Sequence, residues 1–491
     1  MSFKRKIAYN TAVQILGKVV LNSLLSVALV FLLARYLGPK NYGFYSAVIA
    51  FGGLFAILAD FGIYPILIRE MASKPKEQEK IFGKVLVLRL LSAFLVCLLA
   101  FLVSFLTPYP LFIKWAIGIV ALQSLFASLT NFFVSVFQLH YQMDLPVLFE
   151  VLGRAVLLAL VLIVVHFKLG FLEIFWFLAL SSFLNLALLF LLATRYIKIK
   201  PQFDLEFFQH FLRECWPVGI VVILLLVHFK TDTIILSLEK SAYEVGLYGA
   251  AYRIIEVMIL IPLIFSSLLL PKFSEFAFSD QKALKQIFQK AFDILFLFAL
   301  PLVAFLIIFA PQIIVTIAGI DFVGAIAPLR ILVLAVFWPF LYFPIYYLLV
   351  AARKQKALIF PWGAVTVLNI ALNLILIPKF SYKGAAFATF VTEAVLFISA
   401  YFISKEKIKI APDFILLKRS AVPAILTVLI FAALSLIPLL KWDLFLNNGL
   451  VVQILLMFLT FGVGFVVYIL LLLVFRIISK QTLREILIKA G

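Results

Sequence analysis

The sequence predicts an all-α membrane protein that crosses the bilayer fourteen times. Of its 491 residues, 65% are hydrophobic and only 13% are charged. Apolar runs of roughly 20 residues recur along the whole chain, and a helix of that length spans a hydrocarbon core about 30 Å thick. The runs do not alternate polar and apolar residues, as the strands of a membrane barrel do. Helices are therefore expected throughout.

Fourteen apolar segments lie between charged or Pro/Gly-rich breaks. In chain order they are 11–34, 42–68, 81–106, 111–137, 147–167, 173–193, 216–237, 245–270, 291–318, 328–350, 358–377, 384–404, 421–440 and 450–475. The first segment follows Lys4, Arg5 and Lys6, but it is too long for a signal peptide and lacks a small-residue cleavage site. We expect it to be retained as the first span.

The basic residues gather on every second connection and at both termini. The opposite connections hold only Arg35, Lys40, Lys114, Lys168, Lys240, Lys379, Lys383 and Lys441. The positive-inside rule then predicts that both termini are cytoplasmic, which requires an even number of spans. The formal net charge of +19 follows from this topology, so no nucleic-acid partner is expected.

The connections are too short for a soluble catalytic domain. None exceeds about twenty residues, and the two cysteines, Cys97 and Cys215, lie apart in apolar surroundings. A membrane-bound glycan polymerase or ligase would need a larger external loop. The sequence therefore predicts a protein that is not an enzyme and that uses no metal or other cofactor, with Na⁺ or H⁺ as a candidate coupling ion.

A turn motif occurs twice in the chain, 203 residues apart. When "LGPKNYGFYSAVIA" is aligned with "LEKSAYEVGLYGAAYRIIE", Gly43 matches Gly246, Tyr45 matches Tyr248 and Ala47 matches Ala250. Each copy is expected to form a tight turn between the first two spans of one half.

A second alignment supports a duplication, because it matches Gln142 with Gln355 and Gly170 with Gly384 at a shift of about 213. The predicted domains are an N-terminal lobe of six spans (1–200), a C-terminal lobe of six spans (201–404) and two extra spans with a tail (405–491). Parallel repeats of this kind enclose a substrate path in many transporters.

Several segments resemble one family of exporters. The segments "NTAVQILGKVV", "ARYLGPKNYGFYSA", "LADFGIYPILIREMAS", "TDTIILSLEKSAYEVGLYGAAYRIIE" and "NLILIPKFSYKGAAFATFVTE" are similar to the polysaccharide-transporter (Wzx-type O-antigen flippase) family. This family belongs to the multidrug/oligosaccharidyl-lipid/polysaccharide (MOP) exporter superfamily. The resemblance implies two six-helix lobes in a V-shaped, MATE-like arrangement, in a bacterial or archaeal inner membrane.

The resemblance also implies a function. The expected activity is a flippase that moves a polyprenyl-pyrophosphate-linked oligosaccharide, such as an O-antigen unit of lipopolysaccharide, from the cytoplasmic to the outer leaflet by alternating access. Membrane lipid and other polysaccharide assembly proteins are the further partners that the resemblance implies.

Cations inside the spans are candidate contacts for the pyrophosphate, because a charge within a membrane is costly and usually functional. Lys18 shares a polar stripe with Gln14 and Asn22, spaced every four residues, so these side chains are expected to line a cavity. Arg89 and Arg154 lie at a depth similar to that of Lys18, about 10–12 Å from the cytoplasmic end of their spans. In the second half, Lys230 and Arg253 lie toward the outer side.

Other readings of these charges stay open. Glu150 with Arg154, and Arg253 with Glu256, are spaced to neutralise each other on one helix. Asp60 and Glu393 are candidate sites for H⁺ or Na⁺, or partners for Lys18 or Arg89 from a neighbouring helix.

Two rival functions stay open as well. One is the flipping of a lipid-linked peptidoglycan precursor. The other is a MATE-like drug or cation antiporter, which the surplus of cations in the first half opposes.

Overall fold

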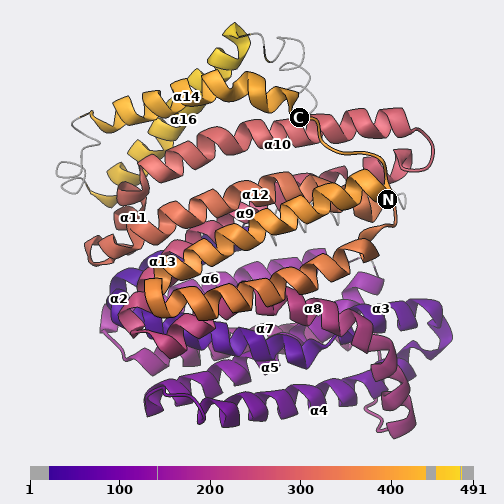
Figure 1. Cartoon of the computed structure of the whole chain (residues 1–491). Helices are drawn as coiled ribbons and strands as arrows, with labels where there is room; N and C mark the ends of the chain where they lie inside the picture. Colours follow the sequence, from indigo (N-terminus) through magenta and orange to yellow (C-terminus); the bar gives the residue numbers. More distant parts are fainter. Residues whose placement is uncertain (1–20, 141, 438–448, 476, 478–491) are drawn as a thin grey trace. The chain divides into compact units, whose positions relative to one another are not determined.

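The computed structural model describes residues 21–140, 142–437, 449–475 and 477, and in this part of the chain the regular elements are all helices (Figure 1). The α-helices are α2 (Asn22–Asp60), α3 (Ile63–Ser73), α4 (Gln78–Ser104), α5 (Leu111–Leu139), α6 (Asp144–Phe167), α7 (Phe171–Ala193), α8 (Leu205–Glu239), α9 (Ala242–Phe276), α10 (Gln281–Ile308), α11 (Ala310–Ala318), α12 (Ile326–Ala351), α13 (Ile359–Lys407), α14 (Ile415–Ser435) and α16 (Leu450–Val474). Short 3₁₀ helices are η2 (Pro75–Glu77), η3 (Ile320–Ala325) and η4 (Gln355–Leu358).

The chain forms two compact units. Unit 1 contains Met1–Gly249 and Asn369–Ser381, and unit 2 contains Ala250–Leu368 and Tyr382–Gly491. These units are defined by packing, whereas the predicted domains 1–200, 201–404 and 405–491 follow the repeat and stay a prediction. In unit 1, α5 packs between α4 and α7 (Figure 1).

Eleven helical segments of the described chain are long and apolar enough to cross a membrane. This finding confirms an all-helical protein with many candidate spans, while the count of fourteen stays a prediction. Two segments, Leu25–Ser73 and Gln355–Lys407, contain 49 and 53 residues, more than twice the roughly 20 that a bilayer requires. Each is interrupted where the sequence predicts a connection, at Gly38 (φ 66°, ψ 172°) and at Ser381 (φ 52°, ψ −136°).

Two predicted spans are divided in the structure. The segment 42–68 is interrupted at Phe61 (φ 40°) and Gly62 (φ 77°), because two consecutive residues with positive φ cannot continue a right-handed helix. The segment 291–318 is divided between α10 and α11, where Pro311 lies in the first turn of α11. Proline lacks the N–H that an unbroken helix would need there.

The two halves of unit 1 hold their turn motifs in a similar way. Near the first copy, the Tyr36 hydroxyl donates to the carbonyl of Leu169, just after α6. Near the second copy, Lys240 Nζ donates to the carbonyl of Pro378 at 2.9 Å, just before the break in α13. Lys168 and Ser381 adopt φ values of 51° and 52°, and they are 213 residues apart, which is the shift of the second alignment.

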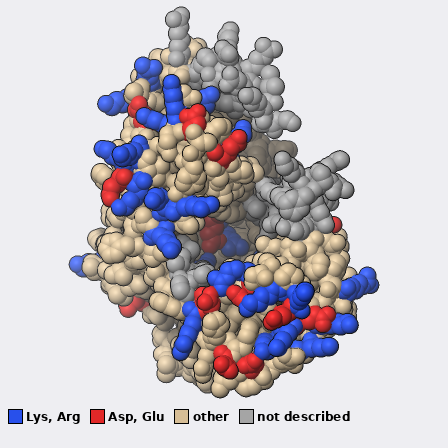
Figure 2. All heavy atoms as spheres, turned by 90° about the vertical axis from the view of Figure 1, so that its right-hand side faces the viewer, with Lys and Arg blue, Asp and Glu red and all other residues tan. Residues whose placement is uncertain are grey.

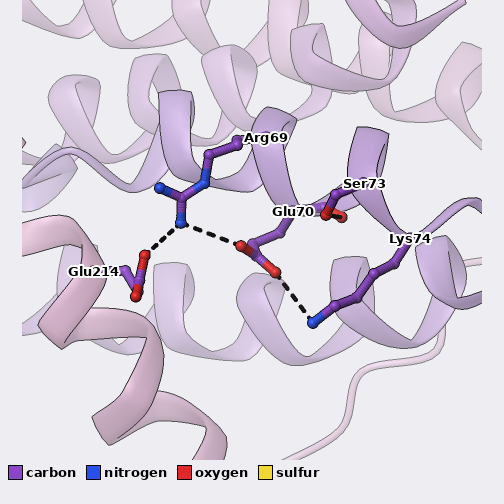
Figure 3. A network of polar contacts seen from close by, with 5 residues as sticks. All are labelled: Arg69, Glu70, Ser73, Lys74 and Glu214. Carbon is purple, nitrogen blue, oxygen red and sulfur yellow. Dashed lines mark hydrogen bonds and ion pairs between the residues drawn. The ribbon is translucent and has the colours of Figure 1, made fainter.

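Ion pairs join the start of α8 to α3. Arg69 Nη2 lies 2.5 Å from the Glu214 carboxylate and 3.2 Å from that of Glu70, which also pairs with Lys74 at 3.3 Å (Figure 3). Arg69 is on α3 and Glu214 is on α8, so the network links two helices that are far apart in the sequence.

The connection before α8 lies against α4. A Cβ atom on Gly83 would fall 1.9 Å from the carbonyl oxygen of Lys200, so only glycine fits there. The Asp204 carboxylate accepts the Phe207 N–H at 3.0 Å as the N-cap of α8, and it also pairs with Lys84 of α4. The first turns of α8 are thereby fixed to both α3 and α4.

The cap of α8 is expected to weaken in acid. The Lys84 ammonium, and then the Phe207 N–H, lower the pKa of Asp204 below its ordinary value of about 3.9. A group whose pKa is lowered by folding stabilises the folded state above its ordinary pKa, and this contribution is lost as the pH falls through the folded pKa. Below about pH 4, backbone hydrogen exchange at residues 205–211 should therefore accelerate more in the wild-type protein than in the Asp204→Asn variant. The asparagine side chain can cap the helix without a charge that is lost in acid. Equal acceleration in both proteins would contradict this role.

The face in Figure 2 carries many Lys and Arg side chains. In unit 1, Arg69 and Lys74 are exposed at the C-terminal end of α3, just before α4 begins. The side of the membrane that this end of α3 faces stays a prediction from the charge pattern.

Candidate functional site

A polar cavity of about 270 Å³ lies inside unit 1 among α5, α6 and α7. Each helix contributes residues spaced by three, four, seven, eight or eleven positions, which places them on one face. The lining residues are Gln123, Ala127, Thr130, Asn131 and Val134 of α5; Pro146, Glu150, Gly153, Arg154 and Leu157 of α6; and Leu178, Ser181, Ser182, Asn185 and Leu189 of α7. The cavity therefore brings two charged and six neutral polar side chains into helices that are otherwise apolar.

Hydrogen bonds fix part of the cavity wall. Gln123 Nε2 donates to Ser182 Oγ at 3.0 Å, and Ser181 Oγ donates to the carbonyl of Gly153 at 2.8 Å. Asn185 Oδ1 is buried and makes no hydrogen bond within the described part of the protein. Such an acceptor is costly to leave unpaired, so it is suited to a ligand that offers an N–H or O–H group.

Arg154 is the cation of this cavity. Its side chain is half-buried, and among the described residues no carboxylate lies within ion-pair distance of its guanidinium, Glu150 of the preceding turn included. A half-buried guanidinium is screened less by water than one on the surface, so it interacts more strongly with an anion. The predicted neutralisation of Arg154 by Glu150 is therefore not found in the structure.

Arg89 of α4 and Asp60 of α2 form an ion pair in which the arginine is buried and the acid is half-buried. Arg89 is 2% exposed, and its Nη2 lies 2.7 Å from Asp60 Oδ1, while its Nη1 donates to the Ala59 carbonyl at 2.7 Å. Asp60 was predicted either to bind H⁺ or Na⁺ or to pair with a cation of a neighbouring helix, and the structure shows it paired with Arg89. Arg89 is absent from the cavity lining, so its contact with pyrophosphate and ion coupling at Asp60 both stay predictions.

The remaining candidates lie elsewhere. In unit 2, Arg253 pairs with Glu256 at 2.6 Å, as their spacing predicts, and Glu393 is 5% exposed in α13. Lys230 is half-buried in α8 of unit 1. Gln14, Lys18 and the side chain of Asn22 lie outside the described residues.

Sequence reasoning missed most of the cavity. The polar positions of α5 and α7 show the same one-face spacing that singled out the stripe on the first span, and this signal could have found them. Asp232, an ionisable residue inside a predicted span that was given no role there, is a 2% exposed carboxylate of α8 that accepts the Thr233 N–H at 2.7 Å and the Tyr248 hydroxyl. Among the described residues, no group of three or more His, Cys, Asp or Glu side chains could hold a metal ion.

Several solved structures of membrane transporters are similar to this fold. A Lipid II flippase, MurJ, in an inward closed conformation, superposes with a TM-score of 0.74 and 17% identity over 90% of this chain and 96% of that one. An inward-facing multidrug resistance MATE family transporter of the MOP superfamily gives 0.64, with 16% identity over 82% and 98%.

A third structure is a MOP superfamily transporter from Pyrococcus furiosus that is described as having a binding pocket of reverse polarity. It gives a TM-score of 0.56, with 15% identity over 82% of this chain and 96% of that one. At these identities the likeness is one of fold. A comparison with curated protein sequences found no match.

The family follows from the sequence itself. Residues 4–277, which are more than half of the chain, match the family described as polysaccharide biosynthesis protein. The matched region includes α2 to α8 and therefore the whole polar cavity. The helical fold, the many candidate spans and this match agree with one another, and the chain belongs to the polysaccharide biosynthesis protein family.

Proposed function

We propose that this protein is a flippase that moves a polyprenyl-pyrophosphate-linked oligosaccharide, such as an O-antigen or another surface polysaccharide unit, from the cytoplasmic to the outer leaflet. The observation that carries the proposal is the polar cavity of unit 1, in which the Arg154 guanidinium lies beside neutral hydrogen-bonding groups and pairs with no carboxylate of the described residues. Membership of the polysaccharide biosynthesis family and the transporter fold support it.

The chemistry of the cavity suits both parts of such a head group. Arg154 offers a planar fork of donors, which can bind two oxygens of a pyrophosphate at once. Gln123, Asn131 and Asn185 offer amide groups that both donate and accept hydrogen bonds, as sugar hydroxyl groups require. The head group would exchange water for these partners while the polyprenyl chain stays in lipid.

The most direct alternative is the flipping of a lipid-linked peptidoglycan precursor. The similarity of fold to a Lipid II flippase favours it, and the cavity chemistry does not distinguish the two substrates. A MATE-like antiporter of cationic drugs is the second alternative. Arg154 would repel a cationic substrate, whereas Glu150 of the same cavity would attract one.

The coupling ion is proposed from two acids, Asp60, which is half-buried, and Glu393, which is buried. Asp60 would have to release the Arg89 guanidinium at 2.7 Å before it could bind H⁺ or Na⁺, so Glu393 is the better candidate. The protein is proposed to act in a bacterial or archaeal inner membrane, with both termini cytoplasmic, alongside other polysaccharide assembly proteins and without covalent chemistry of its own.

Complementation of a bacterial strain that lacks its O-antigen flippase tests the proposal. Surface glycan should return, and the lipid-linked intermediate of the inner leaflet should fall to its normal amount. Restoration only of a strain that lacks its peptidoglycan precursor flippase would favour the alternative substrate. Failure in both strains, together with resistance to cationic drugs, would replace the proposal with an antiporter.

A further inference from the structure

The chain between α7 and α8 lies against α3 and α4, together with the first turns of α8. We call residues 197–216, all of which belong to unit 1, the connecting segment. The Asp204 carboxylate pairs with Lys84 of α4. Further along α8, Glu214 pairs with Arg69 of α3 at 2.5 Å (Figure 3). The start of α8 therefore crosses from α4 to α3 over about 15 Å of helix, at about 1.5 Å per residue.

The position of the connecting segment along α4 is that of a membrane boundary. The Gln202 N–H donates to the carbonyl of Gly83 at 3.3 Å. From Gly83, α4 continues to Ser104, which is about 32 Å of helix at about 1.5 Å per residue. The hydrocarbon core of a bilayer is about 30 Å thick. With Ser104 at one boundary of this core, the connecting segment lies at the other, among the phospholipid head groups.

One side of the connecting segment packs into the interior of unit 1. The buried residues on this side are Ile197, Phe208, Phe211 and Cys215. Lys198 and Lys200 are exposed, and they alternate with Ile197 and Ile199, which pack against the same hydrophobic cluster. Because side chains alternate between two sides of an extended chain, both lysines point away from the protein.

The outer side of the connecting segment is positively charged. Lys198, Lys200 and Arg213 are all exposed there. Of the three acids in the segment, Asp204 and Glu214 are already paired with cations of α4 and α3, which leaves Glu206 as the remaining acid. The exposed surface is therefore suited to an anion.

Large apolar side chains are exposed on the same segment. Phe203 is 69% exposed, Leu205 is 59% exposed and Trp216 is 52% exposed. Leu205 and Trp216 are eleven positions apart, which places them on one side of α8. Apolar side chains of this size are costly to hold in water, and Trp is enriched at the level of the head groups. Cations beside apolar anchors are typical of segments that lie on an anionic membrane surface.

We propose that the outer side of the connecting segment is a binding site for anionic phospholipid. The exposed cations bind the phosphate of the head group, and the apolar side chains insert among the acyl chains. A zwitterionic phospholipid carries its own cation, so it binds less tightly. The ligand is a lipid of the bilayer itself, and the inference therefore depends neither on transport nor on the identity of the substrate.

Trp216 provides a local probe of this site. The purified protein is placed in phosphatidylcholine nanodiscs that contain either dibrominated phosphatidylglycerol or dibrominated phosphatidylcholine at the same mole fraction. Fluorescence quenching that is absent from the Trp216→Phe variant then reports the lipid beside Trp216. Phosphatidylglycerol should be enriched there about tenfold over phosphatidylcholine, and this enrichment should fall as the salt concentration rises.

The double variant Lys198→Gln/Lys200→Gln should reduce the enrichment to within about twofold of parity, because it removes two of the three exposed cations. Lys354→Gln/Lys356→Gln is the matched control. Those lysines are also exposed and have the same spacing, but they lie in unit 2, so the enrichment beside Trp216 should not change. Equal amounts of the two lipids beside Trp216 in the wild-type protein, or an equal loss in both double variants, would overturn the proposal.

Thermal unfolding in detergent distinguishes a lipid site from a site for any phosphate. Added phosphatidylglycerol should raise the midpoint of the wild-type protein by about 2–4 °C, because a ligand of the folded state stabilises it. The rise should be absent from Lys198→Gln/Lys200→Gln. An equal rise with inorganic phosphate would contradict the assignment to lipid. Neither measurement involves export, so a failure of the proposed function would leave this test unaffected.

Discussion

Replacing Arg154 by alanine is expected to reduce export of the lipid-linked saccharide by one to two orders of magnitude. Arg154 is the one Lys or Arg among the described residues that line the polar cavity, and a hydrogen bond to a charged group contributes about 1.5–3 kcal/mol. Arg154→Lys should retain part of the activity, because it keeps the charge and loses the planar fork. The measurement is the rate at which surface glycan appears, together with the amount of trapped intermediate.

Arg195→Ala provides the control for this prediction. Arg195 is exposed just after α7 and is absent from the cavity lining, so its loss removes one positive charge without changing the cavity. Export by Arg195→Ala should match the wild type, and both variants should reach the membrane in normal amounts. Normal export by a correctly inserted Arg154→Ala protein would rule out the cavity as the substrate site.

Replacing Asp60 by alanine is expected to destabilise the protein by about 3–5 kcal/mol, because the change leaves the buried Arg89 guanidinium without its counter-ion. Arg89 is 2% exposed and would keep a charge with only carbonyl oxygens around it. The free energy of unfolding can be measured by SDS titration in mixed micelles. The double variant Asp60→Ala/Arg89→Leu should regain much of the loss, because it leaves no buried charge.

Glu256→Ala is the matched control for the ion pair. Its partner Arg253 lies at a similar distance, 2.6 Å, and Glu256 is exposed about as much as Asp60, 29% against 28%. The cations differ, because Arg253 is 38% exposed and Arg89 is 2% exposed. Pairs exposed to this degree usually contribute less than about 1 kcal/mol. A loss in Glu256→Ala as large as that in Asp60→Ala would show that burial does not set the importance of the Arg89 pair.

Much of the fold could be predicted from the sequence, because the membrane imposes one simple rule. Every buried backbone group needs an internal partner, so long apolar runs become helices, and breaks fall at Gly, Pro and charged residues. Gly38 and Ser381 interrupt the helices α2 and α13 at the positions where the sequence predicts connections between spans. The division at Phe61 and Gly62 was not foreseen, because Phe61 carries no sequence signal for a positive φ.

The candidate site was predicted in part. Arg154 was identified as an intramembrane cation, but its freedom from Glu150 depends on side-chain positions that helical spacing does not determine. The pairing of Arg89 with Asp60 joins two helices through residues 29 positions apart, which no periodicity reveals. The repeat aligned Gly43 with Gly246, yet their contact required the folded chain, because an alignment of two copies does not say that they touch.

Movement of the lipid-linked oligosaccharide between the two leaflets can be measured directly with the purified protein reconstituted into liposomes. Proteoliposomes would contain a short-chain polyprenyl-pyrophosphate oligosaccharide in both leaflets, and an impermeant glycosidase would be added outside. The wild-type protein should expose nearly all of the lipid to the enzyme, whereas Arg154→Ala should leave the inner half protected. Protection of half the lipid by the wild-type protein, as in liposomes without protein, would contradict the proposed function.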